Sequence, residues 1–350
     1  MAKKKEQQEQ QEATHKSKLQ EVTDKLNKQF GEGTILSLDN KTHNNYDVIS
    51  TGSISFDYIT LGTGGFVKGK LYELMGWEGS GKSTICGHAT AECQKLKGKV
   101  LYIDGEHALD KNYFQSLGVD TEKLLICQPS TGEEGFNIAM DMINTGELSL
   151  VIIDSDSSLL PKAVVDGDIG DSSIGKKARL NGTAYPKLKT ALSKNNVCVI
   201  VVSQYREKIG IMYGDPKTTQ GGHALKFYSD CRIEVSKSLK KEDDVTIGNI
   251  TKVKTIKNKM SPPYRISQFE VMFGLGIDKL GELMELGAEY EVFKKWGKQI
   301  TYNDEKYDID QFRTMLIDND EFRESLIDTI KNKIQLTGVK KERIEEEVEN

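Results

Sequence analysis

The chain has 350 residues, of which 37% are hydrophobic and 29% are charged, and this length allows one large core with one or two small appendages. Its formal net charge of -5 argues against a polycation that binds nucleic acid through bulk charge alone, although it is compatible with a local basic surface. No apolar stretch follows the basic N-terminus, so we expect no secretory signal, no membrane association and a cytoplasmic location.

Five cysteines are scattered along the chain, without a CxxC pair or a histidine at zinc-ligand spacing. They are Cys86, Cys93, Cys127, Cys198 and Cys231. We therefore expect buried, reduced thiols rather than disulfides or structural zinc.

The N-terminal region, residues 1–40, begins with a polar, Gln-rich lead-in at residues 1–16, for which disorder is predicted. A helix is predicted next, because apolar residues follow a helical period up to Gly31. These residues are Leu19, Val22, Leu26 and Phe30. Such a narrow apolar stripe must pack on the chain's own core or on another subunit, so we interpret it as an oligomerisation helix.

In the region 41–275, short apolar runs alternate with helical patterns. The runs occupy residues 70–76, 99–104, 124–128, 149–154 and 197–204. Continuous apolar strands of this kind, separated by helices, predict an α/β fold with a mostly parallel sheet covered on both faces. The last run is expected to end at Gln204, where an unusually long loop without regular structure begins.

The pattern changes after residue 230. Three strand-like segments follow one another without a long helix, at residues 231–238, 249–259 and 264–274. They favour antiparallel strands added to one edge of the sheet. Residues 276–350 are predicted to be helical with a short basic and aromatic interruption, which indicates a small α+β C-terminal domain with an acidic tail.

The strongest motif is GWEGSGKST at residues 76–84, which follows a predicted strand and precedes a predicted helix. In a GxxxxGK[ST] loop of this kind, backbone N–H groups and the lysine hold the phosphates of ATP, and the hydroxyl at the last position holds Mg²⁺. The predicted nucleotide-binding residues of the loop are Gly76, Glu78, Gly79, Ser80, Gly81, Lys82, Ser83 and Thr84. Ser83 is the predicted magnesium ligand among them.

Two carboxylates follow other predicted strands. Asp154 ends the run at residues 149–154, where it could hold the magnesium shell or serve as a turn residue. Glu106 lies two residues beyond Asp104, at the end of the strand that follows the phosphate loop in sequence. It is the candidate for positioning and deprotonating water, with a solvated loop glutamate as the alternative.

Taken in order, the segments GWEGSGKST, YIDGEHALD, VIIDS, VVSQYREKIGIMYG, TTQGGHALKFY and VKTIKNKM resemble those of the bacterial RecA recombinase family, phage versions included. The likeness runs from residues 49–57 through residue 287. It implies a RecA-type P-loop ATPase core and an ATP-dependent recombinase that forms a filament on single-stranded DNA and exchanges it with a homologous duplex. A DNA-dependent ATPase motor or regulator of the same fold, without strand exchange, is the alternative. A small-molecule kinase is a third possibility, but the sequence offers no obvious acceptor pocket or Arg-rich lid.

The resemblance also implies roles at matching positions of the ATP site. Glu106 in DGEHALD matches the catalytic carboxylate, and Asp110 and Tyr113 in ALDKNYF match residues that contact and stack on adenine. Gln204 matches the glutamine that senses the terminal phosphate and passes that state to the DNA-binding loop. Its neutral amide can hydrogen-bond a phosphate oxygen or a water.

Lys257 and Lys259 in IKNKM match lysines that reach the ATP of the neighbouring subunit. Spaced i, i+2 in a strand, both would point to one face. Two solvated lysines on an edge strand are the alternative. With them, the implied catalytic set is Lys82, Glu106, Gln204, Lys257 and Lys259.

Two segments match the family's DNA-binding loops. In the first, residues 166–180, the implied contacts are Ser172, Ile174, Gly175 and Arg179, with Ile174 as a wedge between bases. In the second, which begins beyond Gln204, they are Arg206, Lys208, Ile209, Thr218, Gly221, Gly222 and His223. Cations and backbone amides hold phosphates without reading sequence, while an apolar side chain can occupy a gap between unstacked bases.

The sequence departs from the family pattern at several positions. Trp77 stands where Pro is common, Ile174 replaces a commoner Met, and His223 takes a place usually held by Asn. Pro186 stands where a phosphate-contacting Arg is usual, and Lys187, or Lys176 with Lys177, could supply the missing charge. Phe227 matches a position at the subunit boundary, with a core aromatic as the alternative.

The resemblance further implies a homo-oligomeric helical filament and ATP with Mg²⁺ as cofactors. The implied partners are single-stranded DNA, homologous duplex DNA, a single-strand-binding protein, a loader and a self-cleaving repressor of the SOS response to DNA damage.

Overall fold

The computed structural model describes residues 18–31, 34–35, 46–169, 175–207 and 217–340. Residues 1–46 and residues 47–350 form two separate compact units. In the first unit, residues 18–30 form a helix, which confirms the predicted helix. Its oligomerisation role stays a prediction, and the lead-in at residues 1–16 lies outside the described residues.

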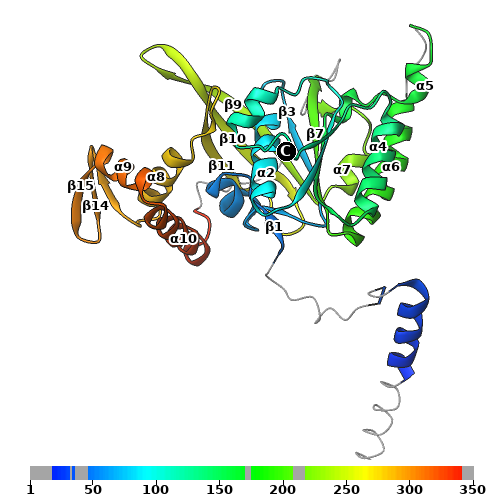
Figure 1. Cartoon of the computed structure of the whole chain (residues 1–350), viewed down its shortest axis with the longest axis horizontal. Coiled ribbons are helices and arrows are strands. Elements are labelled where there is room, and N and C mark those ends of the chain that lie inside the picture. The colour runs from blue at the N-terminus through cyan, green and yellow to red at the C-terminus, as the bar shows by residue number, and fades with distance from the viewer. Residues whose placement is uncertain (1–17, 32–33, 36–45, 170–174, 208–216, 341–350) are drawn as a thin grey trace, which may run out of the picture. The chain divides into compact units, whose positions relative to one another are not determined.

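The second unit is built on a ten-stranded sheet (Figure 1) with the order β12-β11-β10-β9-β3-β7-β6-β4-β5 and with β8 paired to β7. The strands are β3 (Leu71–Gly76), β4 (Lys99–Asp104), β5 (Leu125–Cys127), β6 (Leu148–Asp154), β7 (Cys198–Glu207), β8 (Lys217–Thr219), β9 (Cys231–Glu242), β10 (Val245–Asn258), β11 (Ile266–Met272) and β12 (Gly276–Ile277). The helices among them are α2 (Lys82–Lys95), α3 (Lys111–Ser116), α4 (Gly132–Asn144), η3 (Asp156–Ser158), α5 (Lys162–Val165), α6 (Lys176–Lys194) and α7 (Ala224–Tyr228).

The parallel half of this sheet is buried on both faces, which confirms the predicted α/β core. Successive strand residues point to opposite faces, so Tyr72 packs in one apolar cluster with Ile85 of α2, whereas Leu71 packs in a second cluster with Leu188 of α6. All five predicted apolar runs form strands of this half. Their carboxyl ends lie at one edge, where the loops that follow them can meet.

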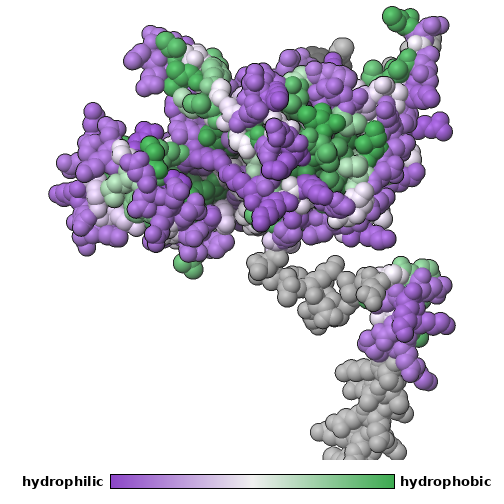
Figure 2. Space-filling view, in the orientation of Figure 1, coloured by the Kyte–Doolittle hydropathy of each residue, from purple (hydrophilic) through white to green (hydrophobic). Residues whose placement is uncertain are grey.

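The strand β9 joins the parallel half to an antiparallel half. It runs parallel to β3 and antiparallel to β10, and β10 pairs antiparallel with β11. This confirms the predicted antiparallel addition to one side of the sheet. The β9–β10 hairpin projects from the sheet in Figure 1, and Figure 2 shows an apolar area on it, where Leu239 and Val245 are exposed.

The C-terminal part contains a three-stranded antiparallel sheet where the sequence indicated only a basic and aromatic interruption. The elements of this part are α8 (Lys279–Glu289), β13 (Lys294–Trp296), β14 (Gln299–Tyr302), β15 (Glu305–Asp308), α9 (Ile309–Asp318) and α10 (Asp320–Thr337). Ile300 of β14 and Phe312 of α9 are fully buried in its apolar cluster. The predicted α+β character is confirmed, and the acidic tail at residues 341–350 lies outside the described residues.

A segment near the start of the second unit contributes to the core of the C-terminal part. This segment is the π-helix η2 (Ser55–Leu61), which follows β1 (Val48–Ile49) and precedes β2 (Phe66–Val67). Ile59 of η2 is buried among the apolar side chains of the C-terminal cluster. The buried Glu282 of α8 accepts hydrogen bonds of 2.5 Å from the hydroxyls of Ser53 and Ser55. The division at residues 275 and 276 stays a prediction.

The expectation that regular structure stops at Gln204 is wrong. β7 continues to Glu207, and β8 pairs antiparallel with it, placing Thr219 opposite Tyr205 and Thr218 opposite Arg206. Aromatic and β-branched side chains pair favourably across antiparallel strands. Over the described residues, the segment that follows Gln204 therefore starts in β7 and returns in β8, and the two strands form a short antiparallel ribbon.

Within the described residues, no helix has the length and apolar character needed to cross a membrane. Four of the five cysteines are buried free thiols, as expected, and Cys127 is half-buried.

Candidate active site

The phosphate loop connects the end of β3 to the start of α2. Gly76 has no room for a side chain, because a Cβ there would lie 2.3 Å from the carbonyl oxygen of Val235. Gly79 and Gly81 have φ values of 63° and 97°, which L side chains rarely adopt. The loop therefore needs these glycines, and it leads into the N-terminus of a 14-residue helix, where backbone N–H groups favour an anion.

Lys82 is the first residue of α2, and its side chain folds back over the loop. Its Nζ donates hydrogen bonds to the carbonyl oxygens of Gly76 at 3.1 Å and Trp77 at 2.8 Å. Burial lowers the pKa of this lysine. The cation is thus only weakly hydrated, and a phosphate beside the loop would gain strongly from its charge.

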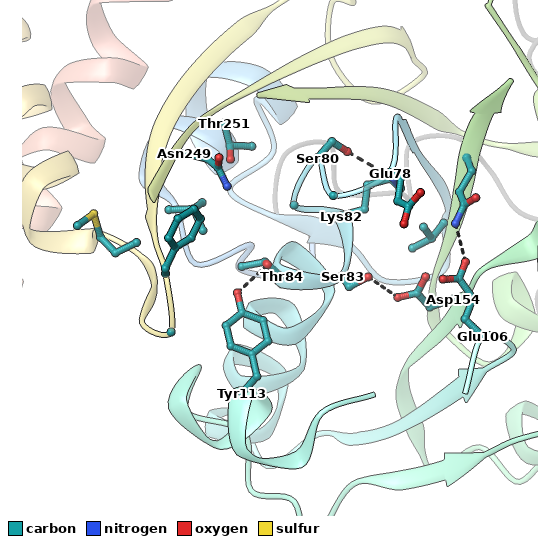
Figure 3. A pocket seen from close by; sticks show the side chains of 18 residues that line it. Glu78, Ser80, Lys82, Ser83, Thr84, Glu106, Tyr113, Asp154, Asn249 and Thr251 are labelled. Carbon is teal, nitrogen blue, oxygen red and sulfur yellow. Dashed lines mark hydrogen bonds between the residues drawn. The ribbon is translucent and has the colours of Figure 1, made fainter. Parts of the chain in front are cut away.

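Ser83 and Asp154 form the oxygen pair expected for Mg²⁺. Ser83 Oγ donates to Asp154 Oδ2 at 2.7 Å, and the hydroxyl of Tyr102 donates to the same oxygen at 2.7 Å. Burial raises the pKa of the Asp154 carboxyl. A hydroxyl and a carboxylate on adjacent elements match the hard oxygen ligands that Mg²⁺ prefers, so the residues present fit this ion (Figure 3).

Glu106 lies in the loop after β4 and faces Gln204 of β7. Gln204 Nε2 donates to Glu106 Oε1 at 2.7 Å, and Ser155 Oγ donates to the same oxygen at 2.6 Å. Glu106 and Asp154 both line the cavity and lie near each other in Figure 3. Two side chains from other segments thus contact its carboxylate, while the Glu106 side chain itself is exposed. Its catalytic role stays a prediction, with the solvated loop glutamate as the alternative.

Tyr113 and Asp110, the two residues assigned to adenine, occupy different surroundings. Tyr113 of α3 lines the cavity, with its hydroxyl 2.8 Å from Thr84 Oγ1. Asp110 caps α3 instead, because its carboxylate accepts from the backbone N–H groups of Asn112 at 2.8 Å and Tyr113 at 3.0 Å. In this arrangement Asp110 orients the helix that carries Tyr113.

The antiparallel half of the sheet supplies a wall of the cavity that sequence reasoning missed. Its residues are Asn249, Thr251, Val271, Met272, Phe273 and Gly274. Asn249 and Thr251 project into the cavity from β10 (Figure 3). In the described part of the chain, the buried Asn249 Oδ1 accepts no hydrogen bond, so it is available to a ligand donor. β10 carries other polar residues, among them Lys252 and Thr255, so the sequence contained no signal that distinguished Asn249 and Thr251.

Lys257 and Lys259 do not line this cavity. Lys257 Nζ donates to the carbonyl oxygens of Lys226 at 2.9 Å and Phe227 at 3.1 Å, and burial, with Lys259 nearby, lowers its pKa. Lys259 Nζ lies 3.6 Å from Asp230 Oδ1. The expectation that both lie within a strand is wrong for Lys259, because β10 ends at Asn258.

Phe227 of α7 carries the carbonyl that Lys257 contacts. Its side chain is 69% exposed, so the core alternative for this aromatic residue is wrong.

The residues assigned to DNA lie around α6, β7 and β8. Gly175 caps α6 and Arg179 is exposed in its first turn, while Arg206 and Thr218 pair across β7 and β8. Beyond β8, the turn before α7 contains Gly221, Gly222 and His223. Ser172, Ile174, Lys208 and Ile209 lie outside the described residues.

Among the lysines considered as replacements for the Arg missing at Pro186, Lys177 points inward. Its Nζ lies 3.6 Å from Asp156 Oδ1. Lys176 donates to the carbonyl oxygen of Ala163 at 3.0 Å, whereas Lys187 is exposed.

Comparison with known proteins places this geometry in a family. The RecA N-terminal domain family model matches residues 17–278. Protein RecA of Cytophaga hutchinsonii is 43% identical over 325 residues, covering 92% of this chain and 91% of the relative. Protein RecA of Clostridioides difficile is 45% identical over 289 residues, covering 82% of this chain and 83% of the relative. The chain therefore belongs to the RecA family.

Proposed function

We propose that this recombinase of the RecA family hydrolyses ATP when it is assembled as a filament on single-stranded DNA, and that it pairs the bound strand with a homologous duplex. The observation that carries the proposal is the hydrogen bond between Gln204 and Glu106. Glu106 lies at the ATP cavity, whereas β7, which carries Gln204, continues through Arg206 into the second DNA segment.

In the proposed reaction, Lys82 and the loop N–H groups hold the phosphates of ATP, and Tyr113 packs against its base. Ser83 and Asp154 would hold Mg²⁺. When bound, this ion would neutralise part of the phosphate charge. Glu106 is placed to orient a water and accept its proton. Phosphoryl transfer depends mainly on such positioning and charge stabilisation.

Lys257 and Lys259 are proposed to complete the site of a neighbouring subunit. They lie outside their own cavity, and Lys257 is next to the exposed Phe227. Cations aimed at developing phosphate charge stabilise the transition state, so hydrolysis would depend on filament assembly. This arrangement would also make isolated subunits poor ATPases.

The other implied features belong to the same proposal. Cations and backbone amides around α6, β7 and β8 would hold the phosphates of single-stranded DNA without reading its sequence. The location would be cytoplasmic. A single-strand-binding protein, a loader and a self-cleaving repressor are the proposed protein partners.

The test measures ATP hydrolysis with and without single-stranded DNA, followed by strand exchange between that DNA and a homologous duplex. DNA-stimulated hydrolysis with strand exchange is the expected result. Stimulated hydrolysis without exchange would favour a motor or regulator of the same fold. Hydrolysis that is indifferent to DNA would contradict the proposed mechanism.

A further inference from the structure

A buried polar cluster lies between the end of β6 and α6, outside the ATP cavity. The cluster, here called the polar clasp, consists of Asp156, Lys177, Asn181 and Tyr185. The Tyr185 hydroxyl donates to Asp156 Oδ1 at 2.5 Å, and Asn181 Nδ2 donates to Asp156 Oδ2 at 3.1 Å. Asp156 and Asn181 are each 1% exposed, and Tyr185 is fully buried. A carboxylate this deeply buried is costly unless it is paired, so these contacts hold the three side chains in one arrangement.

The polar clasp contacts the second DNA segment at Gly221, where that segment returns to the core. Asn181 Nδ2 also donates to the carbonyl oxygen of Gly221 at 3.2 Å. A Cβ at Gly221 would lie 2.3 Å from Asn181 Nδ2, and a Cβ at Gly222 would lie 2.9 Å from the Cβ of Ala178. Both glycines have positive φ values. The chain therefore approaches α6 more closely than any other residue type would allow.

The same cluster holds the helix that follows the first DNA segment. Lys177 lies in the first turn of α6, and its Nζ is 3.6 Å from Asp156 Oδ1, with its side chain only 18% exposed. Lys177 and Asn181 are four residues apart, so they share one face of the helix. Asp156 thus contacts Lys177 of the first DNA segment directly, and it is linked to Gly221 of the second through Asn181.

The polar clasp also adjoins the proposed catalytic carboxylate. Ser155 precedes Asp156 in the chain, and its Oγ donates to Glu106 Oε1 at 2.6 Å. Two adjacent residues just after β6 therefore face different sites, since Ser155 contacts Glu106 and Asp156 contacts Lys177 and Asn181 of α6. This connection does not involve Gln204.

We infer that Asp156 is a positioning residue that fixes both DNA-binding segments relative to each other and to the end of β6, so that they bind single-stranded DNA together. The inference rests on the proposed function. None of the residues of the polar clasp lines the ATP cavity, so its loss should weaken DNA binding without weakening ATP binding.

The test compares Asn181→Asp with the unaltered chain. A carboxylate at residue 181 removes the donor to Asp156 and to Gly221 and places like charges side by side in a buried site. The matched control is Asn144→Asp at the exposed C-terminal end of α4. The rescue variant is Asp156→Asn with Asn181→Asp, which restores one amide and one carboxylate and leaves Tyr185 a carbonyl acceptor.

The measurements are the affinity for a fluorescent ATP analogue and the concentration of an oligothymidylate that gives half-maximal stimulation of hydrolysis. For Asn181→Asp we expect this concentration to rise about tenfold or more, with the affinity for the ATP analogue and the maximal rate unchanged. The rescue variant should recover part of the loss. Equal DNA dependence of Asn181→Asp and the control would overturn the inference. So would an equal loss of ATP affinity, or no recovery in the rescue variant.

The unaltered chain is measured first, because this separates two kinds of failure. Hydrolysis that does not respond to the oligothymidylate would overturn the proposed function and the inference together. A normal response in the unaltered chain, with no effect of Asn181→Asp, would overturn the inference alone.

Discussion

Gln204 and Glu106 are 98 positions apart in the chain, yet Gln204 Nε2 donates to Glu106 Oε1 at 2.7 Å. The contact arises because β7 and β4 lie on either side of β6, so the loop after β4 can reach the carboxyl end of β7. A terminal phosphate or a water held by Glu106 would compete for the same amide. The state of the ATP site is therefore expected to alter the start of the second DNA segment.

Replacing Glu106 with Gln should slow hydrolysis strongly while ATP still binds. The amide keeps the size of the side chain but cannot accept a proton from water, and removal of a general base lowers rates by about 10²- to 10⁴-fold. Steady-state hydrolysis at saturating single-stranded DNA measures the rate, and equilibrium binding of an ATP analogue measures retention of the site. Glu122→Gln, in an exposed loop, is the control. A normal rate in Glu106→Gln would remove Glu106 from the mechanism.

Replacing Gln204 with Ala should uncouple DNA binding from ATP. ATP affinity should change little, because the phosphate loop is untouched, but DNA affinity should become the same with and without an ATP analogue. In the unaltered chain, the free energy of DNA binding should differ by about 1 kcal/mol or more with and without the ATP analogue, as expected for one hydrogen bond to a charged group. Fluorescence anisotropy of a labelled oligonucleotide measures both affinities. Equal affinities in the unaltered chain itself would refute the coupling.

Replacing Lys257 with Ala should lower hydrolysis by roughly 10²-fold or more, since a transition-state cation is lost. If the lysine serves the next subunit, mixing Lys257→Ala with Glu106→Gln chains should restore activity at interfaces that combine an intact lysine with an intact glutamate. Hydrolysis measured across a series of mixing ratios should pass through a maximum. A flat response at every ratio would place Lys257 within its own site or outside the mechanism.

Trp77 should report ligand binding by fluorescence. Its ring centroid lies 5.9 Å from that of Tyr205, at the base of the β7–β8 ribbon, and the chain has two tryptophans. In a Trp296→Phe background, emission from the exposed Trp77 should change when an ATP analogue binds and again when single-stranded DNA is added. Tyr205→Leu should reduce the second change. If the emission spectrum changes with neither ligand, the contact between Trp77 and Tyr205 does not respond to ATP or DNA.

Asp57 should make stability depend on pH near neutrality. Burial raises its pKa to about 7, although Ser50 and Thr51 hydrogen-bond to it. The folded chain therefore binds this proton more tightly than the unfolded chain, and the stabilisation is lost as the pH rises through the folded-state pKa. Between about pH 6 and about pH 8, the free energy of unfolding should fall by about 1 kcal/mol through this group.

Urea unfolding at both pH values measures this effect. Asp57→Asn should remove the fall, whereas the exposed Asp141→Asn should keep it. An identical pH dependence in all three chains would assign it to other groups.

The sequence predicted best what depends on local pattern. Continuous apolar runs located every strand of the parallel half, and the glycine spacing located the phosphate loop, since its φ values leave few alternatives to glycine. Ser83 and Asp154 could be paired in advance because parallel strands and the phosphate loop end at the same edge of the sheet.

Features that depend on sheet order were not predictable in the same way. Asn249 and Thr251 reach the cavity only because β10 follows β9 beside β3. Residue pattern alone favoured an ordinary edge lysine at Lys257 and only the family resemblance gave it a role, whereas its contacts with α7 depend on the fold. Asp156 could not be singled out from the sequence, because its partners lie on a helix more than twenty residues later.

The hydrogen bonds from Ser53 and Ser55 to Glu282 have a consequence for synthesis of the chain. The residues joined by these contacts are 229 and 227 positions apart. The apolar partners of Ile59 in the C-terminal cluster are likewise translated near the end of synthesis. A nascent chain emerges from its N-terminus, so the π-helical segment cannot bury its polar groups until α8 has left the ribosome. The parallel strands of the core can pair earlier, whereas this segment, although translated early, is among the last to reach its native contacts.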